Sequence, residues 1–178
     1  MRKRYLAVWA AFALAASPAG ATLYNLTASL DGAQETPSVA TAGTGTATGT
    51  YDSDLNILLW SGTFTGLNSG TTAAHFHGPA AVGVGPAGIR EGIDTLPDIF
   101  PLGVTAGVFS GSATSATISE TDEANLIAGL WYVNIHSATS TGGEIRGQVF
   151  LTAVPEPATL GLLALGFAGL VWTGRRRV

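Results

Sequence analysis

Residues 56–65 read NILLWSGTFT, and this stretch decides the fold class. Leu58, Trp60 and Phe64 are spaced by two or four positions, so an extended chain places these apolar side chains on one face. The same alternation of apolar and polar residues recurs in residues 24–30. Short segments of this kind, separated by Gly, Asp, Asn and Pro, fill residues 22–153 and are typical of antiparallel sandwiches and barrels. The pattern therefore predicts an all-β domain.

About seven strands and one short helix are predicted. The strands fall at residues 24–30, 44–51, 56–65, 71–77, 107–118, 130–136 and 144–152. The helix covers about residues 122–128, because Ser119 and its neighbours offer N-cap oxygens and Gly129 follows as a stop. Residues 78–101 are predicted to form a long connection, and residues 138–143 a loop between the last two strands. We therefore expect an antiparallel, Greek-key-like β-sandwich that resembles either Cu/Zn superoxide dismutase or an immunoglobulin domain.

Charge is distributed unevenly along the chain. The 178 residues include 12 Asp and Glu, 8 Lys and Arg and no Cys, with a formal net charge of -4. Residues 22–153 hold 11 of the acidic residues and two basic ones, Arg90 and Arg146, which gives this segment a net charge of -9. A nucleic-acid-binding protein needs a basic face, so this class is excluded. Without Cys the chain has no disulfides, thiolate metal sites or cysteine nucleophiles.

The N-terminus has the three parts of a secretory signal peptide. Basic residues at positions 2–4 precede an apolar run over residues 5–16, and the small residues Ala19, Gly20 and Ala21 follow. We expect signal peptidase to cleave after Ala21, so that residues 1–21 form the signal peptide and the protein is exported.

The C-terminus combines a short motif, an apolar stretch at about residues 158–174 and a basic tail at residues 175–177. The motif and the tail consist of Pro155, Glu156, Pro157, Arg175, Arg176 and Arg177. A helix over the apolar stretch is just long enough to span a membrane. Its basic tail prefers the cytoplasm, which leaves residues 22–153 outside.

Residues 154–178 as a whole resemble the PEP-CTERM sorting signal of Gram-negative bacteria. The resemblance implies recognition by an exosortase-type sorting enzyme and release of the processed protein to the cell surface or the exopolysaccharide matrix. The alternative is a permanent single-pass membrane anchor. Both interpretations predict an exported domain whose membrane association is either transient or lasting.

Four segments of the domain carry distinctive residue combinations. They are LDGAQETP at residues 30–37, AHFHGP at 74–79, YVNIH at 132–136 and GEIRGQ at 143–148. Together they resemble the CHRD domain, first described in chordin and widespread in bacteria. The resemblance covers nearly all of residues 22–153 and implies an all-β fold with an unknown or adhesive role. The resemblance therefore predicts the fold but identifies no particular activity.

His75 and His77 are two residues apart on a predicted strand, so their imidazoles share one face with Cα atoms about 6.5–7 Å apart. His136 ends another strand, and all three rings meet if these two strands pair or face each other. A site of nitrogen ligands suits Cu(II) or Zn(II), and an acidic domain attracts cations. The alternative interpretation is structural, with each ring hydrogen-bonded locally.

This pattern also resembles the Cu/Zn superoxide dismutases, which use a His-x-His pair, a distant third copper histidine and an arginine that guides the substrate. The resemblance implies those roles for His75, His77, His136 and Arg146. The chain has only three histidines, so the bridging histidine and the remaining zinc ligands have no counterpart. We therefore expect no enzymatic activity, with superoxide dismutase-like redox activity as the alternative.

Glu144 and Arg146 share one face of the last predicted strand, so we predict a structural ion pair between them, or between Arg146 and Glu35. The sequence thus favours an exported cell-surface or extracellular-matrix β-sandwich module with a non-catalytic binding or structural role. Its predicted partners are extracellular polysaccharide or surface proteins. The alternative is a copper- or zinc-binding protein that uses the three histidines.

Overall fold

The computed structural model describes residues 23–95, 97–114 and 116–155. The strands are β1 (Leu23–Asp31), β2 (Thr44–Asp52), β3 (Ile57–Thr65), β4 (Thr71–His77), β5 (Ile89–Gly92), β6 (Gly107–Ala113), β7 (Tyr132–Ser137), β8 (Ser140–Gln148) and β9 (Phe150–Ala153). The helix is α1 (Glu120–Ile127), and a 3-10 turn, η1 (Gly32–Gln34), follows β1. The predicted signal peptide and nearly all of the predicted sorting segment lie outside the described residues. No helix in the described part of the chain is long and apolar enough to cross a membrane.

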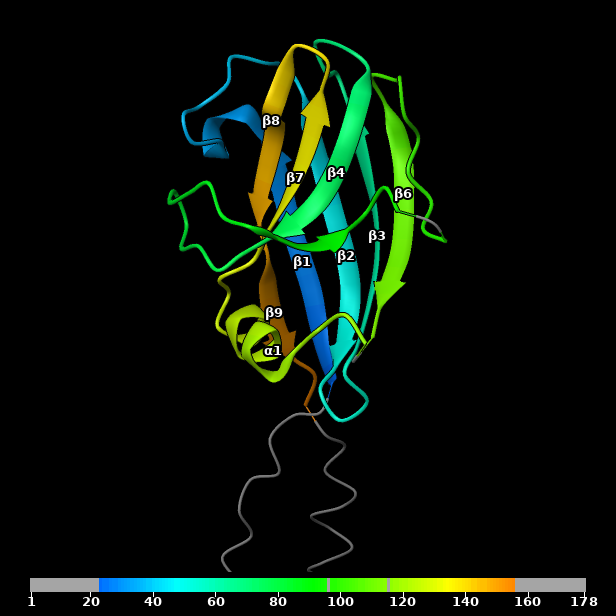
Figure 1. The fold of residues 1–178 in the computed structure, drawn as a ribbon, viewed down its shortest axis with the longest axis vertical. Coiled ribbons are helices and arrows are strands. Elements are labelled where there is room, and N and C mark those ends of the chain that lie inside the picture. The colour runs from blue at the N-terminus through cyan, green and yellow to red at the C-terminus, as the bar shows by residue number, and fades with distance from the viewer. Residues whose placement is uncertain (1–22, 96, 115, 156–178) are drawn as a thin grey trace, which may run out of the picture.

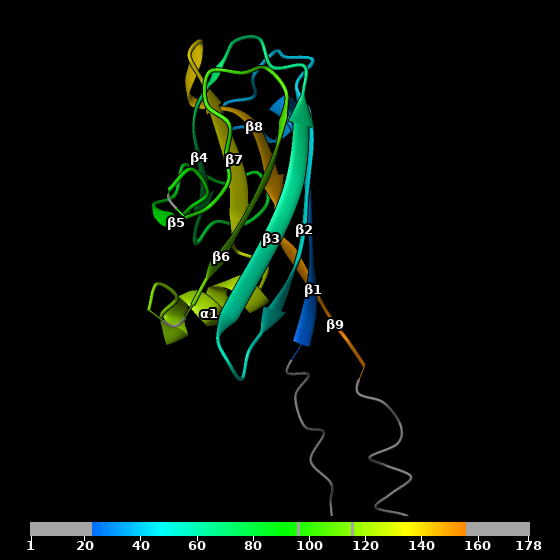
Figure 2. The same cartoon turned by 90° about the vertical axis from the view of Figure 1, so that its right-hand side faces the viewer.

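The strands form one antiparallel sheet in the order β5-β4-β7-β8-β1-β2-β3-β6, with β9 also paired to β1. The sheet folds over where β8 meets β1, at the pair formed by Asp31 and Arg146. Figure 1 shows β4, β7 and β8 in front of β1, β2 and β3, and Figure 2 shows the two layers from the side. The predicted all-β antiparallel architecture is confirmed.

Two long-range pairings give the sheet its Greek-key-like character, because β3 pairs with β6 and β4 pairs with β7. Between β3 and β6 the chain crosses to the other layer, forms β4 and β5, and returns. The order differs from that of immunoglobulin domains, whose second and third strands belong to opposite sheets. Here β2 and β3 pair along their whole length.

The core lies between the two layers and follows the predicted alternation. Leu58, Trp60 and Phe64 of β3 are all buried, as are alternate residues of β1. Trp60 meets Phe76 of β4 edge to face, with ring centroids 5.0 Å apart, so the aromatic contacts join one layer to the other. Burial of apolar surface contributes roughly 25 cal/mol per Å² and is the main force holding the layers together.

Several strand boundaries differ from the prediction. Residues 78–101 contain β5, which pairs with the edge of β4. Residues 140–143 belong to β8, because Ser137 and Ser140 pair across a tight turn. The predicted last strand is divided at Val149, so that β8 pairs with β7 while β9 pairs with β1. These differences arise from pairing between distant parts of the chain, which local propensity does not report.

The segment after β6 turns earlier than predicted and then forms α1. β6 ends at Ala113, and the N–H groups of Thr117 and Ile118 both donate to Thr114 O at 2.9 Å. The Ser119 side chain caps α1 by accepting from Asp122 N–H (3.2 Å), so the predicted short helix is confirmed. At the pole next to α1, the first and last described segments lie side by side, with Val154 N–H donating to Leu23 O (2.9 Å) (Figure 1).

The outer face of the β4-β7-β8 layer is polar yet largely buried. Two loops cover it, residues 32–43 and 78–88. Gln148 Nε2 donates to Ala80 O (3.0 Å) and Arg146 Nη2 donates to Val84 O (2.7 Å), which fastens the second loop onto the face. The face carries His75, His77, Tyr132, Asn134, His136, Glu144, Arg146 and Gln148. This covered polar face, opposite the apolar core, holds the candidate site.

Candidate metal centre

Three histidines meet on the polar face. His75 and His77 lie on β4, and His136 lies on β7, which pairs with β4. One ring nitrogen from each histidine lies within 4.8 Å of those from the other two. Three atoms with mutual separations of at most 4.8 Å all lie within about 2.8 Å of a common point, so a shift of each ring by less than about 1 Å brings them to metal–nitrogen bond length. The structure thus brings together the three histidines that the sequence singles out.

Hydrogen bonds outside the cluster fix the orientation of two rings. His77 Nδ1 donates to Ala87 O (2.9 Å), and His136 Nδ1 donates to Thr141 O (2.9 Å). A carbonyl oxygen only accepts, so both Nδ1 atoms carry hydrogen and both Nε2 atoms present lone pairs. His136 Nε2 accepts a hydrogen bond from Nδ1 of His75 (3.2 Å), which places the third ring at the same point.

The His77 ring keeps an unused acceptor. Its Nε2 is buried and has no hydrogen-bond partner among the described residues. Burial lowers the pKa of His77 to about 4, although the hydrogen bond to Ala87 raises it in part. Burial also lowers the pKa of His136. Both rings are therefore neutral at pH 7, the form in which imidazole binds metals.

Tyr132 lies between His77 and Arg146. Its ring is stacked on that of His77, with centroids 5.1 Å apart and an interplanar angle of 8°, and Arg146 Cζ lies 3.5 Å from its centroid. Ala87 N–H donates to Tyr132 Oη (3.1 Å), so Tyr132 and His77 hold the same residue of the 78–88 loop. The loop, in turn, determines which nitrogen of His77 faces the cluster.

The predicted ion pair among Glu35, Glu144 and Arg146 does not form between these described residues. Arg146 donates to Thr36 Oγ1 (3.3 Å) and to Val84 O (2.7 Å). The Glu144 carboxylate accepts from neutral donors of three other segments. Arg146 and Glu35 influence each other only through their charges, which lower the pKa of Glu35 and raise that of Arg146 against larger effects of burial. Arg146 and Glu144 instead bond to other groups, Arg146 to the loops that cover the face and Glu144 to Thr41, Asn68 and Ser137.

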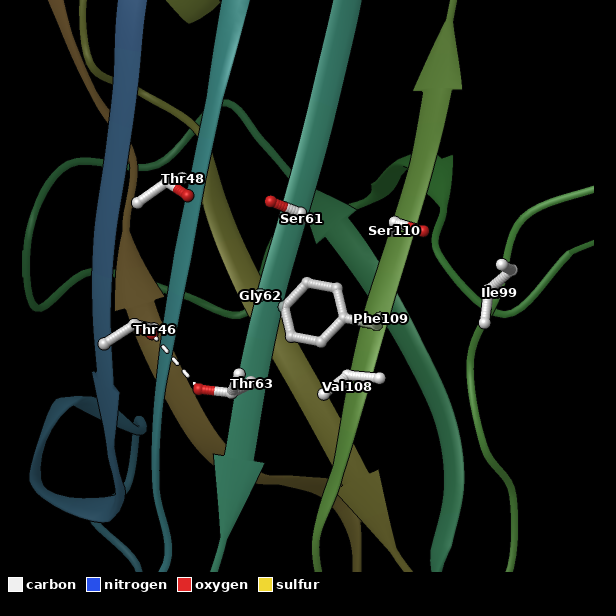
Figure 3. A pocket seen from close by; sticks show the side chains of 9 residues that line it. All are labelled: Thr46, Thr48, Ser61, Gly62, Thr63, Ile99, Val108, Phe109 and Ser110. Carbon is white, nitrogen blue, oxygen red and sulfur yellow. Dashed lines mark hydrogen bonds between the residues drawn. The ribbon is translucent and has the colours of Figure 1, made fainter.

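A shallow hollow lies in the opposite layer, on the outer face of β2, β3 and β6 (Figure 3). Short hydroxyl side chains line most of it, and Thr46 Oγ1 and Thr63 Oγ1 lie 3.4 Å apart there. The described residues that line it include no titratable or metal-ligating side chain. The chemistry of the domain is therefore concentrated on the histidine face.

The domain matches a known family. The model of the CHRD domain matches residues 26–149. The protein belongs to the CHRD-domain family. Residues 153–177 match the PEP-CTERM protein-sorting motif, which implies export, processing by an exosortase-type enzyme and sorting to the surface of a Gram-negative bacterium. No curated protein and no solved structure matches the chain.

In this CHRD domain, the four segments that carry the family resemblance meet on the polar face. Residues 74–79 and 132–136 supply the three histidines, and residues 143–148 supply Glu144 and Arg146. Residues 30–37 lie over them, with Thr36 accepting from Arg146 and Gln34 Oε1 accepting from Gln148 N–H (3.3 Å). The segments distant in sequence therefore build one structural unit.

The sequence reports only part of the centre. Alternation along β7 places Tyr132 and Asn134 on the same strand face as His136. The groups that orient the rings have no such signal, because Ala87 O and Thr141 O are backbone atoms, one in the 78–88 loop and one in β8. Asp94, which lies beside His75, reaches it only because β5 pairs with β4.

Glu35 is a buried acid at the edge of this face. Burial raises its pKa to about 7, although Arg146 and a hydrogen bond from the Thr36 backbone lower it in part. Its Oε1 and Asn134 Oδ1 are buried and lack a hydrogen-bond partner among the described residues. Both pack against Gly143, whose φ is +126 and where a side chain would collide with them. A protonated Glu35 supplies the donor that these two oxygens lack.

We expect Glu35→Gln to raise the free energy of unfolding at pH 8 by about 1–2 kcal/mol and to change it little at pH 5. Because folding raises the pKa of Glu35, the stability from its protonated form is complete below the unfolded value of 4.5 and is lost as the pH rises through about 7. The amide of Gln keeps a donor at every pH. Urea unfolding of both proteins from pH 5 to pH 8 measures the difference, and identical pH profiles would contradict the assignment.

Proposed function

We propose that this exported CHRD-domain protein is a surface metal-binding module that holds Zn(II) or Cu(II) at His75, His77 and His136. The observation that carries the proposal is the convergence of one nitrogen from each ring within 4.8 Å. For His77 and His136 the other nitrogen is already tied to a backbone carbonyl. Rings fixed in this way by a second layer of hydrogen bonds are the usual arrangement of metal-binding histidines.

One ligand–ligand distance matches that around a first-row transition metal. With metal–nitrogen bonds of about 2.0 Å, two ligands of a tetrahedral ion lie roughly 3.3 Å apart. The separation between His75 Nδ1 and His136 Nε2 is 3.2 Å. Three neutral imidazoles favour Zn(II) or Cu(II) over Ca²⁺ or Mg²⁺, which prefer oxygen ligands.

A purely structural role for the rings fits less well. Buried polar atoms in proteins nearly always have a hydrogen-bond partner. His77 Nε2 has none among the described residues, although it is buried and points its lone pair into the cluster. A metal ion gives this nitrogen the partner that the protein does not supply.

We propose binding rather than catalysis as the role of the centre. A superoxide dismutase-like reaction would need a cation free to attract the anion, and Arg146 is buried, stacked on Tyr132 and bonded to Val84 O. The domain then serves as a non-catalytic binding module at the cell surface or in its matrix. Contact with extracellular polysaccharide or surface proteins stays a prediction.

The test is metal titration of the full chain, purified metal-free in detergent. We expect one Zn(II) or Cu(II) per chain in the wild type. His77→Asn retains a donor near the Nδ1 position for Ala87 O but removes Nε2, and we expect it to weaken binding at least about 100-fold. Glu120→Gln, on the exposed start of α1, is the matched control and should bind as the wild type does.

Two results would overturn the proposal. One is a wild-type protein that takes up no metal in stoichiometric amount. The other is equal affinity in the wild type and His77→Asn, since the metal would then be bound elsewhere. Thermal unfolding of the metal-free His77→Asn protein shows whether the variant is folded. If it is not, His75→Gln, at the partly exposed position of the cluster, removes the ligand Nδ1 and gives the same comparison.

A further inference from the structure

Asp94 is held beside His75 by the backbone. β5 ends at Gly92, which pairs with His75 of β4. The next residue, Ile93, is fully buried, and its N–H donates to Ala74 O at 2.8 Å. Asp94 N–H points to the same oxygen at 3.3 Å. A core side chain and two backbone contacts thus fix Asp94 next to the histidine that follows Ala74.

The Asp94 carboxylate faces the side of His75 that points away from the cluster. Asp94 Oδ1 lies 3.7 Å from His75 Nε2, while His75 Nδ1 faces His136. The side chains of His75 and Asp94 are 18% and 19% exposed, so water screens the pair only in part. The carboxylate also acts on His136, because its charge raises the pKa of that ring against the larger lowering by burial.

On the basis of the proposed metal centre, we infer that Asp94 is a positioning residue for it. When a metal binds at Nδ1 of His75, the ring hydrogen must lie on Nε2, and Asp94 Oδ1, 3.7 Å from Nε2, is the acceptor placed to stabilise that form. The centre is then bound through His75 Nδ1, His77 Nε2 and His136 Nε2. Among the described residues, the group of ligand atoms that converge includes no carboxylate, which places Asp94 outside the ligand set.

Asp94 also supplies charge. The three imidazoles are neutral ligands, so they do not compensate the charge of the ion. A carboxylate one ring away attracts a divalent ion about twice as strongly as a monovalent one at the same distance. Asp94 is therefore expected to favour Zn(II) over Cu(I), and its removal should weaken Zn(II) binding more than Cu(I) binding.

The experiment compares Asp94→Ala, which removes both acceptor and charge, with Asp94→Asn, which keeps an acceptor but removes the charge. Asp98→Asn is the matched control, because Asp98 lies on the same connection and its Oδ1 accepts from Ser112 N–H (3.1 Å). Zn(II) and Cu(I) affinities of the full chain are measured by competition with chromophoric chelators. Electron paramagnetic resonance of the Cu(II) form reports the ligand atoms.

We expect Asp94→Ala to weaken Zn(II) binding about 10–100-fold, the usual effect of losing such an outer partner, and Asp94→Asn to weaken it less. Cu(I) affinity should fall by a smaller factor, and the Cu(II) spectrum should keep the signature of three nitrogen ligands. The thermal midpoint of the metal-free protein should stay close to that of the wild type, because the pair is partly exposed.

Three results would contradict this inference, and each has a different meaning. If the wild type binds Zn(II) through the histidines and Asp94→Ala binds it equally well, Asp94 has no role and only this inference fails. If the Cu(II) spectrum of Asp94→Ala shows the loss of an oxygen ligand, Asp94 is a direct ligand and the inference is again wrong. If the wild type binds no metal, both the inference and the proposed function fail.

Discussion

Replacing Glu144 by Ala is expected to lower the free energy of unfolding by about 3–5 kcal/mol. Glu144 is completely buried, and its Oε1 accepts from Thr41 Oγ1 and from Asn68 N–H, each at 2.6 Å. Its Oε2 accepts from the Ser137 hydroxyl. Burial alone would raise the pKa of Glu144, but these three hydrogen bonds outweigh it and lower the pKa.

The size of the effect follows from what the substitution leaves behind. Alanine removes the acceptor of the buried Ser137 hydroxyl and of two part-buried donors, the Thr41 hydroxyl and Asn68 N–H. An unsatisfied buried donor costs about 1–3 kcal/mol, and a part-buried one costs less. It also removes the hydrogen bonds that hold the segments of Thr41 and Asn68 against β8. Thermal unfolding should show the midpoint falling by roughly 10–20 °C for a domain of this size.

Glu144→Gln removes the charge of the side chain and keeps its shape. Its amide oxygen can still accept from Thr41 and Asn68, and its amide nitrogen can donate to the Ser137 hydroxyl, so we expect a smaller loss than for Ala. Glu120→Ala, on the exposed start of α1, should change stability by no more than about 0.5 kcal/mol. A Glu144→Ala protein as stable as Glu120→Ala would show that the carboxylate contributes nothing.

The second large effect is stabilisation by metal. If Zn(II) binds the folded domain alone, a free concentration about 1,000 times the dissociation constant adds about 4 kcal/mol to the free energy of unfolding. We expect the thermal midpoint to rise by roughly 10–20 °C. In His77→Asn the gain should fall to about 1.4 kcal/mol or less, because the Nε2 that lacks a partner among the described residues is removed and binding is at least about 100-fold weaker.

Thermal scans of the full chain with Zn(II), with Mg²⁺ and with a chelator measure this stabilisation. Mg²⁺ is the matched control, since it prefers oxygen ligands and should leave the midpoint unchanged. An equal rise in the wild type and His77→Asn would mean that the ion acts outside the histidine centre. A fall in the midpoint with Zn(II) would mean that the unfolded chain binds it better.

Much of the fold was predictable because strand patterns are local. The alternation in residues 56–65 is buried on one side as predicted, and Leu58 and Trp60 pack in the core. β5 was missed because its four residues, Ile89–Gly92, carry no alternation of their own and are held by pairing with β4. The division of the last strand at Val149 was missed for the same reason, since β8 and β9 have different partners.

The three histidines of the candidate centre were predictable from the sequence, but the nitrogen atoms that converge and their hydrogen-bond partners were not. The two-residue spacing of His75 and His77 fixes them on one strand face. Nothing local shows that β4 pairs with β7, the pairing that brings His136 to them. The predicted ion pair of Glu144 and Arg146 did not form between them, because each meets groups from loops more than sixty residues away.

The all-β class, the strand faces that point to the core and the C-terminal sorting motif can all be predicted without a structure. These properties depend on a period of two or on contiguous residues, so they can be read without knowing any long-range contact. The convergence of the three histidines depends on long-range contacts. So do the hydrogen bonds from His77 and His136 to Ala87 O and Thr141 O, and the position of Asp94 beside His75. Those contacts join strands and loops distant in the chain, and their distances are set by which strands pair and in which register.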